Sequence, residues 1–230
     1  MARQGTARKV KPVAPVERAE TLTEQAYGQI EELIVTLRLK PGQVLSEQLL
    51  SASLGIGRTP IREALQRLAL EGLVTILPRK GILVSEINPQ RQLLLLEVRR
   101  ELERLLARVS AERATPEHRK TFFDIASGME KAAKTNDDIA FMRLDRELNL
   151  LIVEAARNDY AARLMKLLQG LSRRFWYMHY KVAADLPRCA RLHADQALAI
   201  GRGNGKQAAE ATDALMDYVE SFTRATVDIR

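Results

Sequence analysis

The sequence predicts a mainly α-helical protein, in which three short helices and a β-hairpin precede an all-α antiparallel helical bundle. The hydrophobic periodicity changes at Asn88-Pro89: strand-like runs at 73–76 and 82–85 lie before it, and only long helical patterns follow. The 230 residues are enough for two modest domains, each with its own core. We therefore expect one domain at 21–87 and an all-helical domain at 88–230.

The first twenty residues carry five basic side chains, two acids and two prolines, with little apolar patterning. This composition predicts a disordered basic arm at 1–20. The whole chain has a formal charge of +7, which attracts polyanions without specifying one.

Start and stop signals predict three helices before the hairpin. Thr21 and Glu24 have the spacing of a capping box, and Ser46 is a suitable N-cap for a short second helix that ends at Gly55. Thr59 can cap the third helix, with Pro60 in its first turn. Two short helices joined by a tight turn form a helix-turn-helix, and the hairpin adds a wing.

Several polar side chains of this unit are candidates for DNA contact. Thr59, Arg62 and Gln66 share the side of the third helix opposite its apolar stripe. An arginine fork bonds a guanine edge or a phosphate, and glutamine suits an adenine edge. Arg58 stands at the N-terminus of this helix, and Glu63 is expected to pair with Arg67 as surface support. The wing tip adds two cations: Arg79 and Lys80.

These motifs closely resemble the DNA-binding domain of GntR-family regulators, without an obvious gap from about residue 22 to 86. The resemblance is carried by Pro41-Gly42, Ser46-Glu47, Leu54-Gly55, Arg58-Thr59-Pro60-Ile61-Arg62-Glu63-Ala64-Leu65, Glu71-Gly72-Leu73 and Pro78-Arg79-Lys80-Gly81. It implies that Arg58, Thr59 and Arg62 contact an operator, together with the second helix and the wing. Gln48 stands where the family often has arginine, so a phosphate contact there is expected to be weaker. The alternative is a winged helix that binds protein, with solvated arginines.

Helical patterns and their breaks predict six further helices, near 90–111, 116–134, 139–157, 161–184, 187–201 and 206–226. Asp145 and Asn149 lie on the helical side that also carries Phe141 and Leu148, and Arg99 is flanked by apolar residues. Buried polar groups need partners, either one another or a ligand. The aromatic run 175–180 covers every face of its helix, so some side chains must line the core and others a pocket or subunit interface; we expect it to be mainly core.

This second region resembles the FCD ligand-binding and dimerisation domain of the FadR-like subfamily. The motifs are Glu97-Val98-Arg99 with Leu102-Glu103, Asp145 to Asn149, Asn158, His193 and Gly203-Asn204. The resemblance implies a divalent metal held by one Asp and three His residues, and an arginine near the position of Arg99 that assists a carboxylate effector.

The chain departs from that metal pattern at two of the four ligands. Asp145 and His193 match, but Asn149 stands at the first histidine, and the third falls at Leu215 or Tyr218. None of these replacements suits a zinc or nickel ion. We therefore favour a metal-free pocket without a cofactor, in which Arg99 and Arg173 bind an anionic ligand. The alternatives are that Asp145 pairs with an arginine and that His193 is an ordinary polar residue.

The sequence thus predicts a homodimeric regulator that binds an inverted-repeat DNA operator and senses an organic acid. The resemblance implies repression, which is the family's commoner habit. A constitutive regulator with a vestigial pocket is one alternative. A metal-dependent enzyme is another, but three histidines, no nucleophile–base pair and no glycine-rich phosphate loop argue against it.

Compartment signals favour the cytoplasm. Cys189 is the one cysteine in the chain, no secretory signal is recognisable, and no apolar stretch is long enough for a membrane span. The effector, the operator sequence and the direction of regulation stay open.

Overall fold

The computed structural model describes residues 21–79 and 81–227, so the predicted basic arm and Lys80 lie outside the described residues. The first unit contains α1 (Leu22–Val35), β1 (Val44–Leu45), α2 (Glu47–Leu54), α3 (Arg58–Leu70), β2 (Val74–Leu77) and β3 (Gly81–Val84). The capping box at Thr21 and Glu24 forms, Ser46 caps α2, and Gly55 is left-handed with φ +67°. The expected cap of α3 is wrong: Gly57 is the N-cap and Thr59 lies inside the helix, which therefore begins earlier.

The three strands form an antiparallel sheet in the order β1-β3-β2. In the hairpin, Val74 pairs with Val84 and Leu77 pairs with Gly81. The first strand therefore begins one residue later than the predicted run 73–76, and the second begins one residue earlier than the predicted run 82–85. β1 was not predicted, because two residues are too few to show alternation; it is held by pairing with β3. Arg79 forms the turn with a left-handed backbone, φ +62°.

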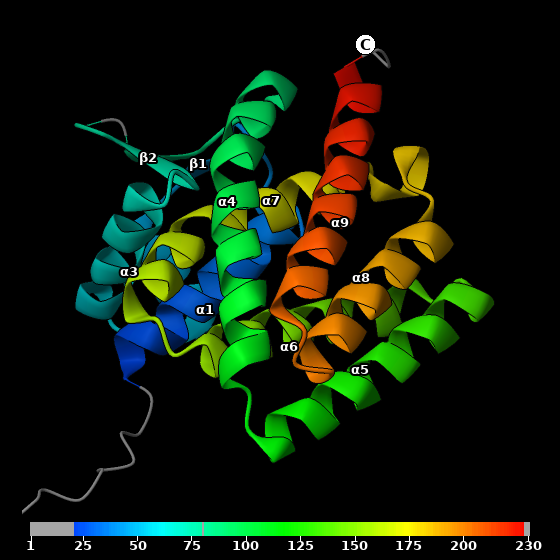
Figure 1. The fold of residues 1–230 in the computed structure, drawn as a ribbon. Helices are drawn as coiled ribbons and strands as arrows, with labels where there is room; N and C mark the ends of the chain where they lie inside the picture. The colour runs from blue at the N-terminus through cyan, green and yellow to red at the C-terminus, as the bar shows by residue number, and fades with distance from the viewer. Residues whose placement is uncertain (1–20, 80, 228–230) are drawn as a thin grey trace, which may run out of the picture.

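The second unit consists, among the described residues, of six long helices. They are α4 (Pro89–Arg113), α5 (Pro116–Thr135), α6 (Asp138–Ala156), α7 (Asp159–Ala183), α8 (Leu186–Gly201) and α9 (Gly205–Val227). An Asn, Thr or Asp side chain caps the N-terminus of each of the first five, because its oxygen accepts an amide that the helix leaves unpaired. α4 and α9 run antiparallel and side by side, and α5 packs against α8 (Figure 1).

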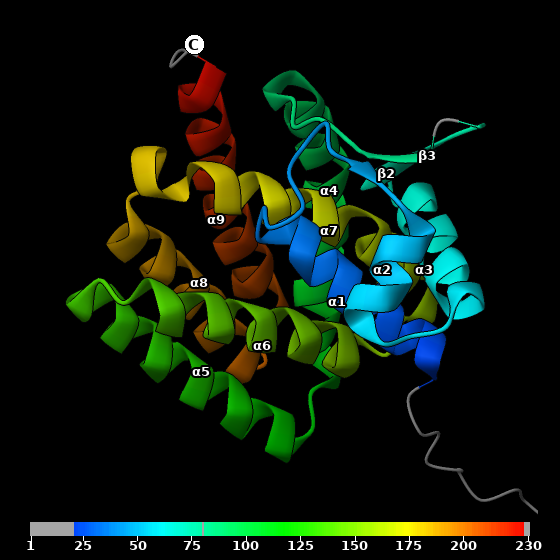
Figure 2. The same cartoon turned by 180° about the vertical axis from the view of Figure 1, so that it is seen from behind.

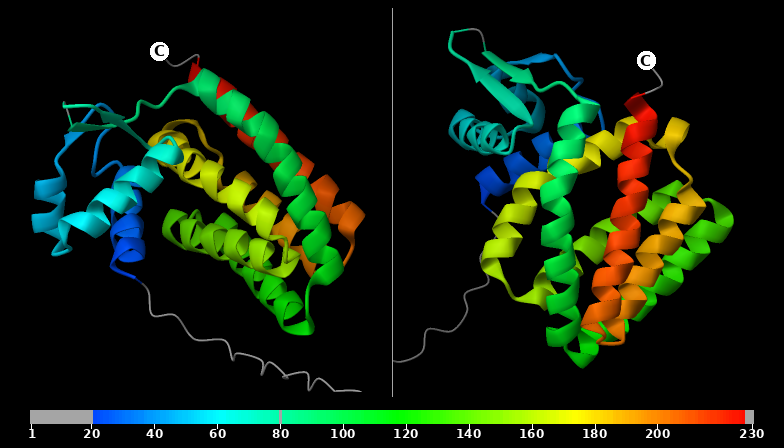
Figure 3. Two further views of the ribbon diagram at one scale, coloured as in Figure 1. Left: turned by 90° about the vertical axis from the view of Figure 1, so that its left-hand side faces the viewer. Right: turned by 45° about the horizontal axis from the view of Figure 1, so that its top comes forward.

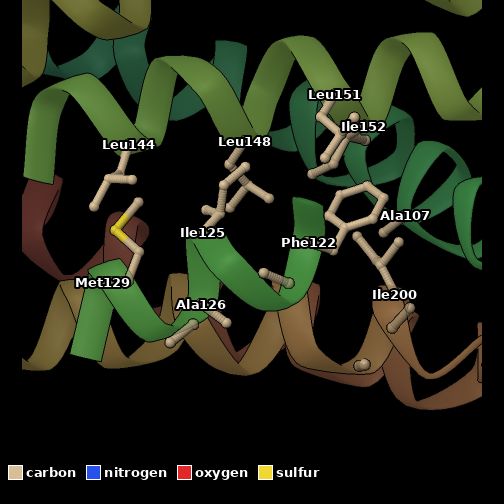
Figure 4. Close-up of a cluster of buried hydrophobic side chains, with 14 of the residues drawn as sticks. Ala107, Phe122, Ile125, Ala126, Met129, Leu144, Leu148, Leu151, Ile152 and Ile200 are labelled. Atoms are coloured by element: carbon tan, nitrogen blue, oxygen red, sulfur yellow. The ribbon is translucent and has the colours of Figure 1, made fainter. Parts of the chain in front are cut away.

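The core of the bundle lies where α5 faces α6 and α8. Figure 4 shows side chains of α6 pointing at α5: Leu144 toward Met129, Leu148 toward Ile125, and Ile152 toward Phe122. Phe122 is fully buried in this cluster. A smaller and separate cluster of buried residues, among them Ile30, Ile61 and Leu65, fills the first unit.

The two units meet along α7, which packs against α1 (Figures 2 and 3). Leu171 of α7 packs on the core of the first unit. A Cβ atom at Gly170 would lie 2.8 Å from Leu73 Cδ1, so a larger residue here would require the buried Leu73 side chain to shift. Within 21–79 and 81–227, no helix combines the length and apolar character needed to cross a membrane.

Candidate functional sites: an exposed helix face and a buried cavity

The predicted DNA-contacting side chains of the first unit that the structure describes are all exposed. Gln48 lies on α2, and Arg58, Thr59, Arg62 and Gln66 lie on the side of α3 opposite its buried stripe. Arg62, Gln66 and Arg79 also line one hollow between α3 and the hairpin. We call this surface the reading face, defined by Gln48, Arg58, Thr59, Arg62, Gln66 and Arg79. A further cation that the sequence suggested for DNA contact, Lys80, lies outside the described residues.

Arg62 does not extend freely from the reading face. Its Nη2 lies 2.7 Å and its Nε 3.0 Å from the two carboxylate oxygens of Glu47 on α2. This fork lowers the pKa of Glu47 and raises that of Arg62. The pair is solvated, since 60% of the Arg62 side chain is exposed, and so it orients the guanidinium at little cost in free energy.

The expected ion pair between Glu63 and Arg67 is wrong. Arg67 lies 3.7 Å from the centre of the Tyr27 ring and bonds Glu71 at 3.4 Å. Glu71 is buried and also accepts the Tyr27 hydroxyl at 2.8 Å, so it needs a cation more than exposed Glu63 does. Glu63 accepts instead from Thr23 of α1.

A cavity of about 330 Å³ lies between α7 and the helices around it. All five residues that the sequence suggested for effector binding line its wall: Arg99, Asp145, Asn149, Arg173 and His193. They come from α4, α6, α7 and α8, so the fold brings together side chains that are far apart in the sequence. We call this space the bundle cavity.

An ion pair between Asp145 and His193 lies on its wall. His193 Nε2 is 3.1 Å from Asp145 Oδ1, and His193 Nδ1 is 2.8 Å from the carbonyl oxygen of Cys189. Since both ring nitrogens face acceptors, the ring is held as an imidazolium. Burial opposes this charge, but Cys189 and the bond to Asp145 raise the pKa of His193 well above its ordinary value.

The acid of this pair shows the opposite shift. Burial would raise the pKa of Asp145, but the hydrogen bond and the charge of His193 lower it, with help from Arg99 and Arg173. Burial raises the pKa of the neighbouring Cys189 thiol. The Asp145 carboxylate and the His193 imidazolium are thus each stabilised by the other.

The side chains around this pair do not fit a divalent metal. Asn149 donates to Asp145 Oδ1 at 3.0 Å, Leu215 is buried, and Tyr218 donates its hydroxyl to the carbonyl oxygen of Asp185. No three His, Cys, Asp or Glu side chains of the described chain gather as a metal site would require. Both nitrogens of His193 are already engaged, which leaves none free to coordinate an ion.

The two arginines expected to meet a ligand already have protein partners. Arg99 bonds Glu103, one turn along α4. Arg173 reaches Glu31 at 3.3 Å and Glu32 at 3.2 Å, both on α1 of the first unit. Two further arginines that sequence reasoning missed, Arg143 and Arg146 of α6, also line the cavity.

The aromatic run 175–180, expected to be mainly core with some members in a pocket or interface, is divided in this way: Phe175 and Tyr180 are buried, and Trp176 and Tyr177 are half-buried. Phe175, Trp176 and Tyr177 line the bundle cavity, and the Trp176 Nε1 donor is buried without a hydrogen-bond partner among the described residues. Tyr180 is buried and bonds Asp138. A run that covers every face of a helix has no periodicity from which to read this difference.

α1 and its C-cap also form part of the cavity wall, through Glu32, Val35 and Thr36. Sequence reasoning assigned α1 to the first unit alone and missed this role. Nothing in the pattern of α1 signals it, because the contact depends on how the two units pack.

Comparison with protein families settles the kind of protein. The model for bacterial regulatory proteins of the gntR family matches residues 22–84, and the FCD domain model matches residues 94–218, more than half of the chain. The chain belongs to the GntR family and carries an FCD domain. The protein is therefore a transcriptional regulator. Its relatives are likewise named as regulators rather than as enzymes.

Its relatives differ in how much of the chain they cover. An uncharacterised HTH-type regulator of Streptomyces ambofaciens is 48% identical over 65 residues, 28% of this chain and 28% of that protein. The HTH-type transcriptional repressor RspR of Escherichia coli is 25% identical over 203 residues, 88% of this chain and 89% of that protein. The structure of E. coli McbR (YncC) covers 90% of this chain and 99% of its own, with a TM-score of 0.78 at 19% identity, and shows the shared fold.

Proposed function

We propose that this regulator binds an inverted-repeat operator as a homodimer through the reading face, and that an organic acid in the bundle cavity modulates the binding. Residues 21–87 would read DNA, and residues 88–230 would bind the effector and dimerise. The observation that carries the proposal is the two-sided character of α3. Its inner side is fully buried, whereas Arg58, Thr59, Arg62 and Gln66 are exposed on its outer side.

The chemistry of the reading face supports DNA as the partner. The N-terminus of α3 carries Arg58 and Thr59 and favours a phosphate, while Arg62 and Gln66 stand one turn further along, where base edges would lie. Arg79, at the turn of the hairpin, suits the neighbouring backbone or minor groove.

The wall of the bundle cavity supports an organic anion as the effector. Four arginines and two acids line it, so it attracts negative charge. Five aromatic side chains offer apolar surface to the rest of a ligand: Phe141, Phe175, Trp176, Tyr177 and Phe222. The volume of about 330 Å³ suits a small molecule.

Homodimerisation is supported by apolar surface on α4. Leu94 and Val98, one helical turn apart, are 62% and 55% exposed. A second copy of the chain would cover them, and a two-fold dimer would match a two-fold operator. Repression is supported by the relative that is named a repressor.

A constitutive regulator whose cavity binds nothing is the second candidate. It is favoured by the internal pairing of the cavity's charges, Asp145 with His193 and Arg99 with Glu103. Titration of small carboxylates against the protein–DNA complex separates the two candidates, because a sensor changes its DNA affinity and a constitutive regulator does not.

The test of DNA reading begins with selection of bound duplexes from a random pool, followed by fluorescence anisotropy on the selected sequence. We expect an inverted repeat, and we expect Arg62→Ala to weaken binding about 5- to 150-fold, the effect of losing one good base contact of about 1–3 kcal/mol. Arg108→Ala is the matched control, because Arg108 is an exposed arginine of α4 with an i,i+4 acid partner. Equal affinities for wild type and Arg62→Ala would remove α3 from the proposed role, and a selected single half-site would contradict the dimer.

A further inference from the structure

We propose that Arg173 is a switch: Glu31 and Glu32 hold it in the ligand-free protein, and an organic anion in the bundle cavity takes it from them and so loosens α1 from α7. This inference rests on the proposed function and names the regulation of the same cavity. It names the residue that couples effector binding to DNA binding, and it states that the effector loosens the contact between α1 and α7.

The cavity and the interface between the units share a wall. Arg173 lines the cavity together with Glu32 and Val35 of α1 and with Thr36, the C-cap of α1. α1, a helix of the first unit, is thus in direct contact with the space that a ligand would fill. No intermediate chain of residues is needed to carry the signal.

The bonds of Arg173 to α1 are long for charged partners. Its nitrogens lie 3.3 Å and 3.2 Å from Glu31 and Glu32, whereas Arg104 of α4 and Asp213 of α9 meet at 2.7 Å and 2.9 Å. Charge-assisted bonds are ordinarily about 2.7–2.9 Å. The pairing across the units is therefore the looser of the two, and a ligand carboxylate in good geometry can replace it.

Glu31 depends on this arginine. Burial raises the pKa of Glu31, and the charge of Arg173 opposes that rise. If a ligand takes Arg173, the Glu31 carboxylate stays partly buried with weakened compensation, and it is stabilised by moving into water. Movement of Glu31 into water carries α1 away from α7.

The segment between β3 and α4 is attached to α7 by contacts that do not involve Arg173. Arg174, the next residue of α7, donates to the carbonyl oxygens of Ser85 and Glu86 in the segment between β3 and α4. Both bonds are independent of the cavity anion. Release of α1 therefore frees the first unit to turn about this anchored segment rather than to detach. Such a turn changes the spacing of the two reading faces in a dimer.

The first test needs no ligand. In the double variant Glu31→Gln, Glu32→Gln, hydrogen–deuterium exchange over residues 22–35 should be several-fold faster than in wild type, because neutral amides hold Arg173 weakly. The control is Asp213→Asn, which breaks the tighter pair with Arg104 inside the bundle and should leave exchange over 22–35 unchanged. Unchanged exchange in the double variant, or the same increase in the control, would overturn the switch. The single variant Glu32→Gln repeats the exchange measurement with only the more exposed of the two acids changed.

The second test uses benzoate as the anion and benzamide as its neutral analogue, measured by isothermal titration calorimetry on the full chain. The double variant leaves Arg173 without competitors, so it should bind benzoate about tenfold more tightly than wild type, within the usual range of coupling between sites. Adding Arg173→Gln to it should abolish the gain, and benzamide should show none. Equal affinity in wild type and double variant, or no benzoate binding by the double variant, would overturn the proposal.

These outcomes are separate from those of the proposed function. If the wild-type protein selected no DNA sequence, the proposed operator binding would be contradicted. The exchange measurement and the benzoate titration would still report on Arg173. Conversely, wild-type DNA reading with unchanged exchange in the double variant would leave the regulator intact and remove only the switch.

Discussion

The reading face and the bundle cavity both present arginines, but they assemble them differently. The reading face takes most of its polar side chains from one stretch of α2 and α3, and they stay exposed in the folded chain. The cavity collects its arginines from α4, α6 and α7, and Arg99, Arg143 and Arg173 have carboxylate partners. The first site can be changed without touching the fold, whereas the second is also part of what holds the fold together.

Packing should separate the core of the bundle from the reading face most strongly. Phe122→Ala removes a fully buried ring from the core of the bundle and should lower the free energy of unfolding by about 3–5 kcal/mol. Arg62→Ala on the reading face should change it by less than about 0.5 kcal/mol. Urea unfolding followed by circular dichroism measures both. A similar loss in the two variants would contradict the division of roles.

The ion pair on the cavity wall should give the next largest effect. Asp145→Ala leaves the His193 imidazolium without its carboxylate and should cost about 2–3 kcal/mol, less than for a fully buried pair because 27% of the Asp145 side chain is exposed. The control is Glu147→Ala, whose partner Arg143 is well solvated. If both variants unfold at the same urea concentration, the pair contributes nothing to stability.

The same pair should make this cost depend on pH. The pKa of His193 is raised above 6.5, so its stabilisation is complete below pH 6.5 and is lost as pH rises through the folded value. The pKa of Asp145 is lowered below 3.8, so its share is complete above pH 3.8 and is lost as pH falls through its folded value. The difference between wild type and Asp145→Ala should therefore be greatest between about pH 4 and 6.5. A difference that stays constant up to pH 10 would show that His193 is not charged in the folded chain.

The smallest expected effect lies at the wing. Arg79→Ala should weaken binding to all duplexes alike and reduce the slope of log affinity against log salt by about one, since one phosphate contact is lost. Anisotropy titrations at several salt concentrations measure the slope. Loss of affinity for the selected sequence alone would show that Arg79 reads bases.

Signals that are local in the sequence predicted the fold well. N-caps, prolines and glycines marked the helix boundaries to within a few residues, because each acts on its own turn. One miss was local, because Gly57 rather than Thr59 caps α3. Others were non-local or very short: β1 exists through its pairing with β3, and Arg67 leaves Glu63 for the buried carboxylate of Glu71. The five suggested cavity residues could be found from polar side chains on apolar helix faces and from the family resemblance. The partners of Arg173, and the part of α1 in the wall, could not be found this way, because they depend on the docking of the two units.

The lone thiol of the chain offers a practical consequence. Cys189 is 1% exposed, and its side chain lies on the wall of the bundle cavity. An aromatic disulfide reagent that reacts with it must first gain access to that wall, so the rate of colour development reports how often the wall opens. No label need be introduced, and a molecule that occupies the cavity would reveal itself by protecting one sulfur atom from reaction.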